Sequence, residues 1–299
     1  MAVLNQEKPE MNPNSGIPEQ SVAMTALFPS RLTDEVVASY KNRSDPRLQE
    51  IMISLVKHLH SFAREVKLTG AEWLKGVEFL TQVGLFCTET RQEFIALSDV
   101  LGLEMTVIEL NHGTANGATE ATLLGPFYIP DAPELAKGAA VCGDPPGEPL
   151  DVMGEVQDLK GKPIANALID VWQAGDGGLY SSQDPHKQKF ELRGRFRSDR
   201  DGTYHFKSVM PKGYQIPSDG PVSGLMRLTG RSLWRPPHLH FMISAKGYKR
   251  LTTHLFPKGA PHLDEDAVFG VKETLIQDFK RNADGKGYTL NFNFVLGQA

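Results

Sequence analysis

The stretch RPPHLHFMI, residues 235–243, places two histidines one residue apart inside an apolar run. In a β-strand, side chains two residues apart lie on the same face, so His238 and His240 share one face while Leu239 and Phe241 share the other. The apolar face suits a sheet core, and the double proline before the pair marks a strand entry. The two imidazoles, roughly 7 Å apart along the backbone, can converge on one metal ion, but the pair does not identify the metal. The alternative is that both are half-buried polar side chains.

Short alternating runs, broken by frequent Gly and Pro, continue on both sides of this stretch. The runs cover residues 150–174, 193–209, 238–257 and 288–296. The second run predicts a hairpin around DRDG at 199–202, and the third predicts two strands about AKGY at 245–248. A helix-like segment lies at 266–280. The pattern predicts an antiparallel β-sandwich over residues 113–299.

Residues 31–112 have helical periodicity instead, so the predicted class is α+β. In the segment 45–62 apolar residues recur at helical spacing and form one stripe, which is typical of helices that pack on each other. Asp45 is placed to cap this helix, and Thr69 and Glu72 have the spacing of a capping box. Residues 1–30 are expected to form a loose N-terminal tail.

Composition excludes several functional classes. The chain has 299 residues, a net charge of -4 and a pI of about 6.2, which does not favour nucleic acid or an anionic membrane as a partner. Its two cysteines, Cys87 and Cys142, do not form a disulfide framework. No apolar run is long enough to span a membrane, and the N-terminus lacks the apolar core of a secretory signal. We therefore expect a cytoplasmic protein.

Further metal ligands must come from elsewhere in the chain. It has no thiolate pair and no HExxH helix. Tyr180 in GDGGLYSSQDP and Tyr214 in MPKGYQIPSDGP lie in glycine-rich stretches, where a tyrosine is usually a packing residue. Phenolate oxygen can nonetheless bind iron. The residues alone leave these alternatives open.

Several motifs together resemble the intradiol ring-cleavage dioxygenases that act on catechols and hydroxyquinols. The matching stretches are LLGPFYIPDAP, IDVWQAGDGGLY, LRGRFRSDRDGTYHFKSVMPKGYQIPSDGP, RPPHLHF and YKRLTTHLFPKG with DEDAVFGVKETLI. The resemblance implies a non-haem Fe(III) bound by Tyr180, Tyr214, His238 and His240. It also implies a homodimer joined through the helical domain, often with bound phospholipid. Pro237 departs from the pattern, since alanine is commoner there, and we expect no effect from it.

Two residues bear on the substrate. His254 in LTTHLF and Phe127 in GPFY resemble the hydroxyquinol enzymes, whereas catechol enzymes usually have glutamine and leucine there. Hydroxyquinol, cleaved by O2 to 3-hydroxy-cis,cis-muconate or maleylacetate, is the first prediction, and a catechol giving cis,cis-muconates is the second. By motif position, the residues lining the pocket would be Asp99, Leu123, Leu124, Gly125, Pro126, Phe127, Ile216, Pro217 and Val268.

The resemblance also implies catalytic roles. Tyr214 would accept a substrate proton, Arg235 would stabilise negative charge on the ring, and His254 would orient oxygen species. Two rival hypotheses remain. One is a cupin-type HxH site, which needs a carboxylate ligand that the residues near HLH do not offer. The other is a transthyretin-like binding module, suggested by SDRDGTYHF alone.

Overall fold

A computed structural model of the chain describes residues 30–41, 44–88, 91–112, 117–144, 146–184 and 186–299. The predicted tail therefore lies outside the described residues, apart from Ser30. The chain divides into two compact units, one ending at Gly76 and one beginning at Val77. No helix among the described residues is both long enough and apolar enough to cross a membrane.

The first unit contains helices α1 (Arg31–Ser39) and α2 (Pro46–Glu65) and the start of α3 (Gly70–Leu85), all within the predicted helical region. Both predicted caps are confirmed. The Leu48 amide donates to the Asp45 carboxylate at 2.9 Å. The Thr69 amide donates to the Glu72 carboxylate at 2.9 Å, and the Glu72 amide donates to the Thr69 hydroxyl at 3.3 Å.

The sequence pattern predicts that the apolar stripe of α2 packs against other helices, but most of the stripe is exposed. Leu48, Ile51, Leu55 and Leu59 are each 46% to 55% exposed. Val56 is the one α2 residue that the described chain buries. The stripe therefore offers an uncovered apolar face.

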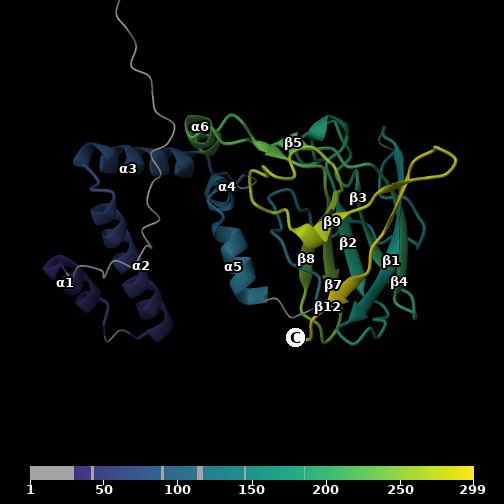
Figure 1. The fold of residues 1–299 in the computed structure, drawn as a ribbon, viewed down its shortest axis with the longest axis horizontal. Coiled ribbons are helices and arrows are strands. Elements are labelled where there is room, and N and C mark those ends of the chain that lie inside the picture. Colours follow the sequence, from purple (N-terminus) through teal and green to yellow (C-terminus); the bar gives the residue numbers. More distant parts are fainter. Residues whose placement is uncertain (1–29, 42–43, 89–90, 113–116, 145, 185) are drawn as a thin grey trace, which may run out of the picture. The chain divides into compact units, whose positions relative to one another are not determined.

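The second unit contains the rest of α3, helices α4 (Glu93–Val100) and α5 (Leu103–His112), and the sheets shown in Figure 1. The first sheet has the order β10-β11-β1-β12, with β4 also beside β1. Its strands are β1 (Pro149–Asp158), β4 (Thr203–Val209), β10 (Lys280–Arg281), β11 (Tyr288–Asn291) and β12 (Phe294–Leu296).

The second sheet carries the histidine pair's strand and has the order β3-β2-β7-β8-β9. Its strands are β2 (Leu168–Trp172), β3 (Arg193–Arg197), β7 (Leu239–Ser244), β8 (Leu251–Pro257) and β9 (Ile276–Gln277). A separate two-stranded sheet pairs β5 (Tyr214–Gln215) with β6 (Trp234–Arg235). Short helices η1 (Asp176–Gly178), α6 (Pro221–Leu228) and η2 (Glu273–Leu275) lie between strands.

Aromatic side chains from both large sheets meet in one core. The ring of Phe206 on β4 lies 5.0 Å from that of Phe196 on β3 and 6.1 Å from that of Phe241 on β7. Leu239, Phe241 and Ile243 all belong to this buried cluster, as the alternation in RPPHLHFMI predicts. The predicted α+β class with a β-sandwich is confirmed.

The sandwich differs from the prediction in strand direction. β1 pairs in parallel with β11 and with β12, and β8 pairs in parallel with β9, so both large sheets are mixed. The strands in these parallel pairs are far apart in the sequence, so no short turn forces them to be antiparallel. The strands about AKGY, β7 and β8, do form the predicted antiparallel pair.

The hairpin prediction around DRDG is wrong. A tight turn does form there, with the Gly202 amide donating to the Asp199 carbonyl at 3.0 Å. However, β3 before it pairs with β2 and β4 after it pairs with β1, so the turn leads from one sheet to the other. Local turn chemistry predicted the reversal, but the choice of partner strand depends on long-range packing.

The helix predicted at 266–280 is also absent from this described segment, where only the three-residue η2 is helical. The amides of Val268 and Gly270 donate to the Asp266 carboxylate at 3.4 Å and 2.9 Å. Phe269 has a φ of 57°, in the left-handed region. A side chain that binds nearby amides competes with helix formation, and here the result is a compact turn.

Candidate metal centre

The histidine pair lies where β7 begins. His238 and His240 are 2% and 1% exposed. The Nδ1 atom of His238 donates to the Pro236 carbonyl at 2.7 Å. Because a carbonyl can only accept, the Nε2 atom keeps its lone pair in the neutral ring. The Pro236 carbonyl thus orients His238 as a ligand through Nε2.

The two tyrosines reach the same point from loops. Tyr180 follows η1, and Tyr214 lies on β5 opposite Arg235 of β6. Gly178 explains the glycine-rich sequence: its φ is 75°, and a Cβ atom there would lie 2.8 Å from the Cβ atom of Tyr214. Only glycine tolerates this approach. The glycines therefore bring the two phenol-bearing segments together.

Four potential donor atoms converge. The Tyr180 oxygen lies 2.7 Å from His240 Nε2, 3.4 Å from His238 Nε2 and 3.4 Å from the Tyr214 oxygen. The two histidine Nε2 atoms are 3.1 Å apart. Atoms that share one ion at bond lengths of about 2 Å have such separations. The residues therefore fit a metal ion held by two phenols and two imidazoles.

Burial sets the protonation of these groups. It lowers the pKa of both His238 and His240 well below the ordinary value, and the nearby Arg235 acts in the same direction. Burial also raises the pKa of Tyr180, and the Tyr214 phenol raises it further. Both imidazoles are therefore neutral and available as ligands. The Arg235 and Arg193 charges act to lower this pKa but do not offset burial, so the Tyr180 phenol needs a bound metal cation before it can ionise.

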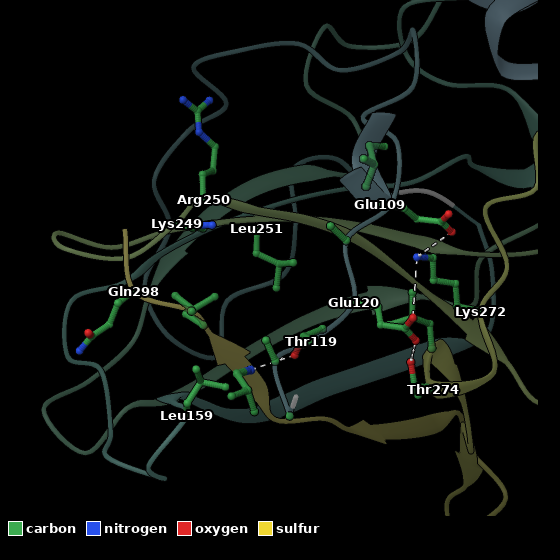
Figure 2. Close-up of a pocket in the computed structure, with 18 of the residues that line it drawn as sticks. Glu109, Thr119, Glu120, Leu159, Lys249, Arg250, Leu251, Lys272, Thr274 and Gln298 are labelled. Carbon is green, nitrogen blue, oxygen red and sulfur yellow. Dashed lines mark hydrogen bonds and ion pairs between the residues drawn. The ribbon is translucent and has the colours of Figure 1, made fainter. Parts of the chain in front are cut away.

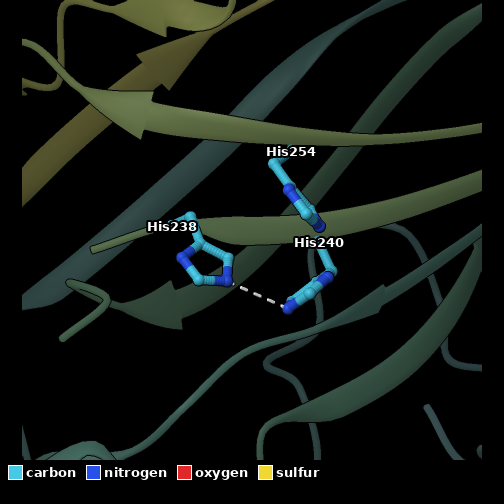
Figure 3. A group of neighbouring side chains, drawn as sticks. All are labelled: His238, His240 and His254. Carbon is cyan, nitrogen blue, oxygen red and sulfur yellow. Dashed lines mark hydrogen bonds between the residues drawn. The ribbon is translucent and has the colours of Figure 1, made fainter. Parts of the chain in front are cut away.

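A third histidine lies beside the pair, as Figure 3 shows. His254 on β8 is opposite His240 in the register, and their ring centroids are 4.2 Å apart. The three histidines offer ligand atoms within 4.8 Å of one another. Neither ring nitrogen of the buried His254 has a hydrogen-bond partner among the described residues. His254 is thus close to the centre, with both nitrogens free for a substrate or an oxygen species.

Arg235 is fully buried beside the donors. Its Nη1 atom lies 3.4 Å from the Tyr214 oxygen and 3.3 Å from His238 Nε2. Its Nε atom donates to the Asp266 carboxylate at 3.1 Å. Burial is the largest single influence and acts to lower the pKa of Arg235, but the charge and hydrogen bond of Asp266, together with the Tyr214 and Tyr180 phenols, raise it overall. The site therefore contains a permanent positive charge.

Five of the predicted pocket residues form two packed groups, and three others are exposed. Phe127 stacks on Tyr180 with centroids 4.6 Å apart, and a Cβ atom on Gly125 would lie 3.6 Å from the His240 ring. Leu123, Ile216 and Val268 join one apolar cluster. Leu124, Pro126 and Pro217 are exposed.

Asp99 on α4 is buried, and its Oδ1 atom has no hydrogen-bond partner within the described ranges. Burial and the neighbouring Glu104 carboxyl raise the pKa of Asp99 to about 8, while Arg235 acts in the opposite direction. The carboxyl is therefore mostly protonated at neutral pH and can donate a hydrogen bond.

A cavity of about 910 Å³ elsewhere in the second unit contains none of these groups (Figure 2). It is lined by residues from α5, β8 and β12, among others. Lys272 there forms ion pairs with Glu109 and Glu120, each at 3.7 Å. Its charge is thus already balanced, and the one group of His, Cys, Asp or Glu side chains among the described residues that could hold a metal is the three-histidine group.

The sequence analysis missed two residues of the site. The first is Asp266, which forms an ion pair with Arg235. It lies in the quoted motif DEDAVFGVK, two residues before the predicted pocket residue Val268, but no role was predicted for it. Trp172 on β2 stacks on His240, with centroids 4.7 Å apart and the rings inclined by 14°. The register of β2 against β7, which places Trp172 opposite His240, was not visible in the sequence.

Fold and site together define a class: a β-sandwich protein in which buried phenols and imidazoles converge as potential donors to one metal ion. Residues 123–298 match the family described as Dioxygenase, and residues 45–119 match the family described as Catechol dioxygenase N terminus. The chain therefore belongs to the intradiol ring-cleavage dioxygenases, an iron-dependent family of enzymes.

Individual relatives are similar over most of their length. The chain is 48% identical to 6-chlorohydroxyquinol 1,2-dioxygenase of Cupriavidus pinatubonensis, covering 89% of this chain and 96% of the relative. It is 47% identical to hydroxyquinol 1,2-dioxygenase of a Rhizobium species, covering 86% and 87%. The solved structure of hydroxyquinol 1,2-dioxygenase from Pseudomonas putida matches with a TM-score of 0.84 and 43% identity, covering 90% of this chain and 98% of that one.

Proposed function

We propose that the protein cleaves hydroxyquinol between its two adjacent hydroxylated carbons, at a ferric ion bound by Tyr180, Tyr214, His238 and His240. Both atoms of O2 enter the product, 3-hydroxy-cis,cis-muconate or its maleylacetate tautomer. The convergence of two phenols and two imidazoles is the observation that carries this proposal. When bound, a ferric ion would hold both diol oxygens and draw electron density from the ring.

The two phenols have different roles in this proposal. Tyr180 is fully buried and its oxygen contacts both histidines. The Tyr214 oxygen instead faces Arg235 Nη1 at 3.4 Å. Tyr214 accepts a proton from a substrate hydroxyl at this oxygen, with the guanidinium beside it. Arg235 then stabilises negative charge that develops on the bound ring.

His254 and Asp99 complete the proposed site. His254 orients oxygen species, which the free nitrogens of its buried ring support. Asp99 forms a hydrogen bond with the third hydroxyl through its buried Oδ1 atom, which has no partner among the described residues. The remaining pocket walls are Leu123, Leu124, Gly125, Pro126, Phe127, Ile216, Pro217 and Val268.

Oxygen uptake by the iron-loaded protein tests this substrate assignment. Uptake equal to the hydroxyquinol consumed, with a product heavier by one O2, is expected, together with slower turnover of catechol. Asp99→Leu should reduce the preference for hydroxyquinol about tenfold, because Leu has no polar atom for the third hydroxyl and a buried unmade hydrogen bond costs about 1–3 kcal/mol. Faster turnover of catechol by the wild-type protein would contradict the assignment to hydroxyquinol.

We also propose a homodimer joined through the helical domain, residues 31–112, with the sandwich domain at 113–299. The uncovered stripe on α2 supports this, because a second copy with bound phospholipid would bury it. The free thiols of Cys87 and Cys142 support a cytoplasmic location. Sedimentation of the purified protein, with mass spectrometry of its solvent extract, tests the dimer and the lipid. A monomer without lipid would contradict both.

A further inference from the structure

We infer that Asp266 is a positioning residue, which directs one nitrogen of the buried Arg235 guanidinium at the reaction site. This inference rests on the proposed function, because it gives Asp266 a part in ring cleavage. Asp266 touches no proposed ligand or substrate atom and acts through Arg235.

The nitrogens of the Arg235 guanidinium have different partners. Asp266 Oδ1 accepts from Nε at 3.1 Å, and Oδ2 accepts from Nη2 at 3.5 Å. The two side chains are 3% and 2% exposed. Nη1 is left to face the Tyr214 oxygen at 3.4 Å and His238 Nε2 at 3.3 Å. A planar guanidinium held along one edge cannot rotate its other edge away from the site.

Asp266 is itself held on several sides. Its carboxylate accepts from the amides of Val268 and Gly270, at 3.4 Å and 2.9 Å. The amide of Ala267 donates to the carbonyl of Trp234, the residue before Arg235, at 3.0 Å. The turn at 266–270 is therefore tied both to the arginine's strand and to its side chain.

Gly270 is part of this arrangement. A Cβ atom there would lie 3.1 Å from Arg235 Nη2 and from Leu123 Cδ2, and 3.2 Å from Asp266 Oδ2. Glycine thus permits the close approach of the turn to the ion pair. Because the same turn carries Val268, it sets both a wall of the proposed pocket and the direction of the arginine.

A donor fixed before the reaction stabilises developing charge without having to reorganise. Without Asp266, Nε and Nη2 lose their acceptor and the guanidinium can rotate, so that Nη1 no longer faces the Tyr214 oxygen. The expected consequence is a slower chemical step rather than weaker binding of the substrate.

The test is Asp266→Asn in the iron-loaded enzyme, with the exposed Asp264→Asn of the same segment as matched control. We expect kcat for hydroxyquinol to fall about 10- to 100-fold, as small misplacements of a catalytic group do. The dissociation constant for hydroxyquinol without O2, the iron content and the visible absorption should change far less. An unchanged kcat, or a kcat that falls only in proportion to lost iron, would overturn the inference.

A double variant keeps the test valid if Asp266→Asn alone fails to fold. Arg235→Met combined with Asp266→Asn leaves no unpaired buried charge, which is the arrangement that buried pairs tolerate best. In Arg235→Met alone the buried Asp266 carboxyl can become neutral by taking up a proton. The two variants should therefore have equal kcat per folded, iron-loaded protein, because Asp266 then has nothing to position. A further fall would overturn the inference. If the wild-type protein does not cleave hydroxyquinol, the proposed function fails instead. This outcome is distinguishable because it is seen in the wild-type protein, whereas the two results that overturn the inference are seen only in the variants.

Discussion

The two halves of the donor set are built differently. His238 and His240 lie at the start of a strand within a five-stranded sheet, where strand register and the Pro236 carbonyl fix them. Tyr180 and Tyr214 come from a loop and a two-residue strand, which approach each other only because Gly178 lacks a side chain. The sheet therefore supplies rigid ligands, while the loops supply ligands whose position depends on their neighbours.

This difference predicts that the two halves of the donor set have different roles in metal binding and turnover. The histidines should be needed for any metal binding, whereas Tyr214, beside Arg235 on the separate two-stranded sheet, should be needed mainly for turnover. Substitutions in each half of the donor set test this prediction.

The largest effect is expected for His240→Ala. It removes a buried ligand from the rigid half, so iron affinity should fall by more than about 100-fold, beyond the effect of losing a supporting contact, and activity should fall to background. The ratio of iron to protein after loading and dialysis measures it. The exposed His186→Ala is the matched control. Retention of stoichiometric iron by His240→Ala would contradict the role of the sheet.

Tyr214→Phe tests the loop half. We expect iron to remain bound while kcat falls about 100- to 10,000-fold, the usual contribution of a positioned proton acceptor. Steady-state turnover and iron content are measured on the same sample, with Tyr288→Phe in the other sheet as control. Full turnover would remove Tyr214 from the proposed mechanism.

Asp99→Asn should change how stability depends on pH. Burial raises the pKa of Asp99 to about 8 from 3.8, so between these values the folded protein holds this proton more tightly than the unfolded chain. The contribution is therefore present at low pH and is lost as pH rises through the folded value, by at most about 1.4 kcal/mol per pH unit. Urea unfolding at pH values from about 5 to about 8 should show a smaller loss of stability in the variant. Equal slopes would contradict the raised pKa.

Pro237→Ala should have the smallest effect. The proline precedes β7 and needs no ladder hydrogen bond, so we expect a change in unfolding free energy of less than about 1 kcal/mol. Iron content and kcat should match the wild-type values. A loss of iron would show that the second proline helps to fix His238.

The same difference between strand and loop ligands explains which parts of the site could be predicted from the sequence. The shared face of His238 and His240, and the core side of Leu239 and Phe241, follow from strand periodicity, which is local. Tyr180 and Tyr214 entered only through resemblance, because their meeting depends on loops 34 residues apart in sequence. The role of Asp266, and the placement of β3 and β4 in different sheets, were not predicted for the same reason. Their partners are chosen by packing between distant segments.

The visible absorption of the iron-loaded protein is the sharpest test of a centre with two tyrosine and two histidine ligands. Two coordinated tyrosinates should give a strong charge-transfer band that colours the protein, and Tyr180→Phe and Tyr214→Phe should each weaken or shift it. A fully loaded but colourless protein would contradict the four-ligand centre. It would point instead to coordination by His238, His240 and His254 alone.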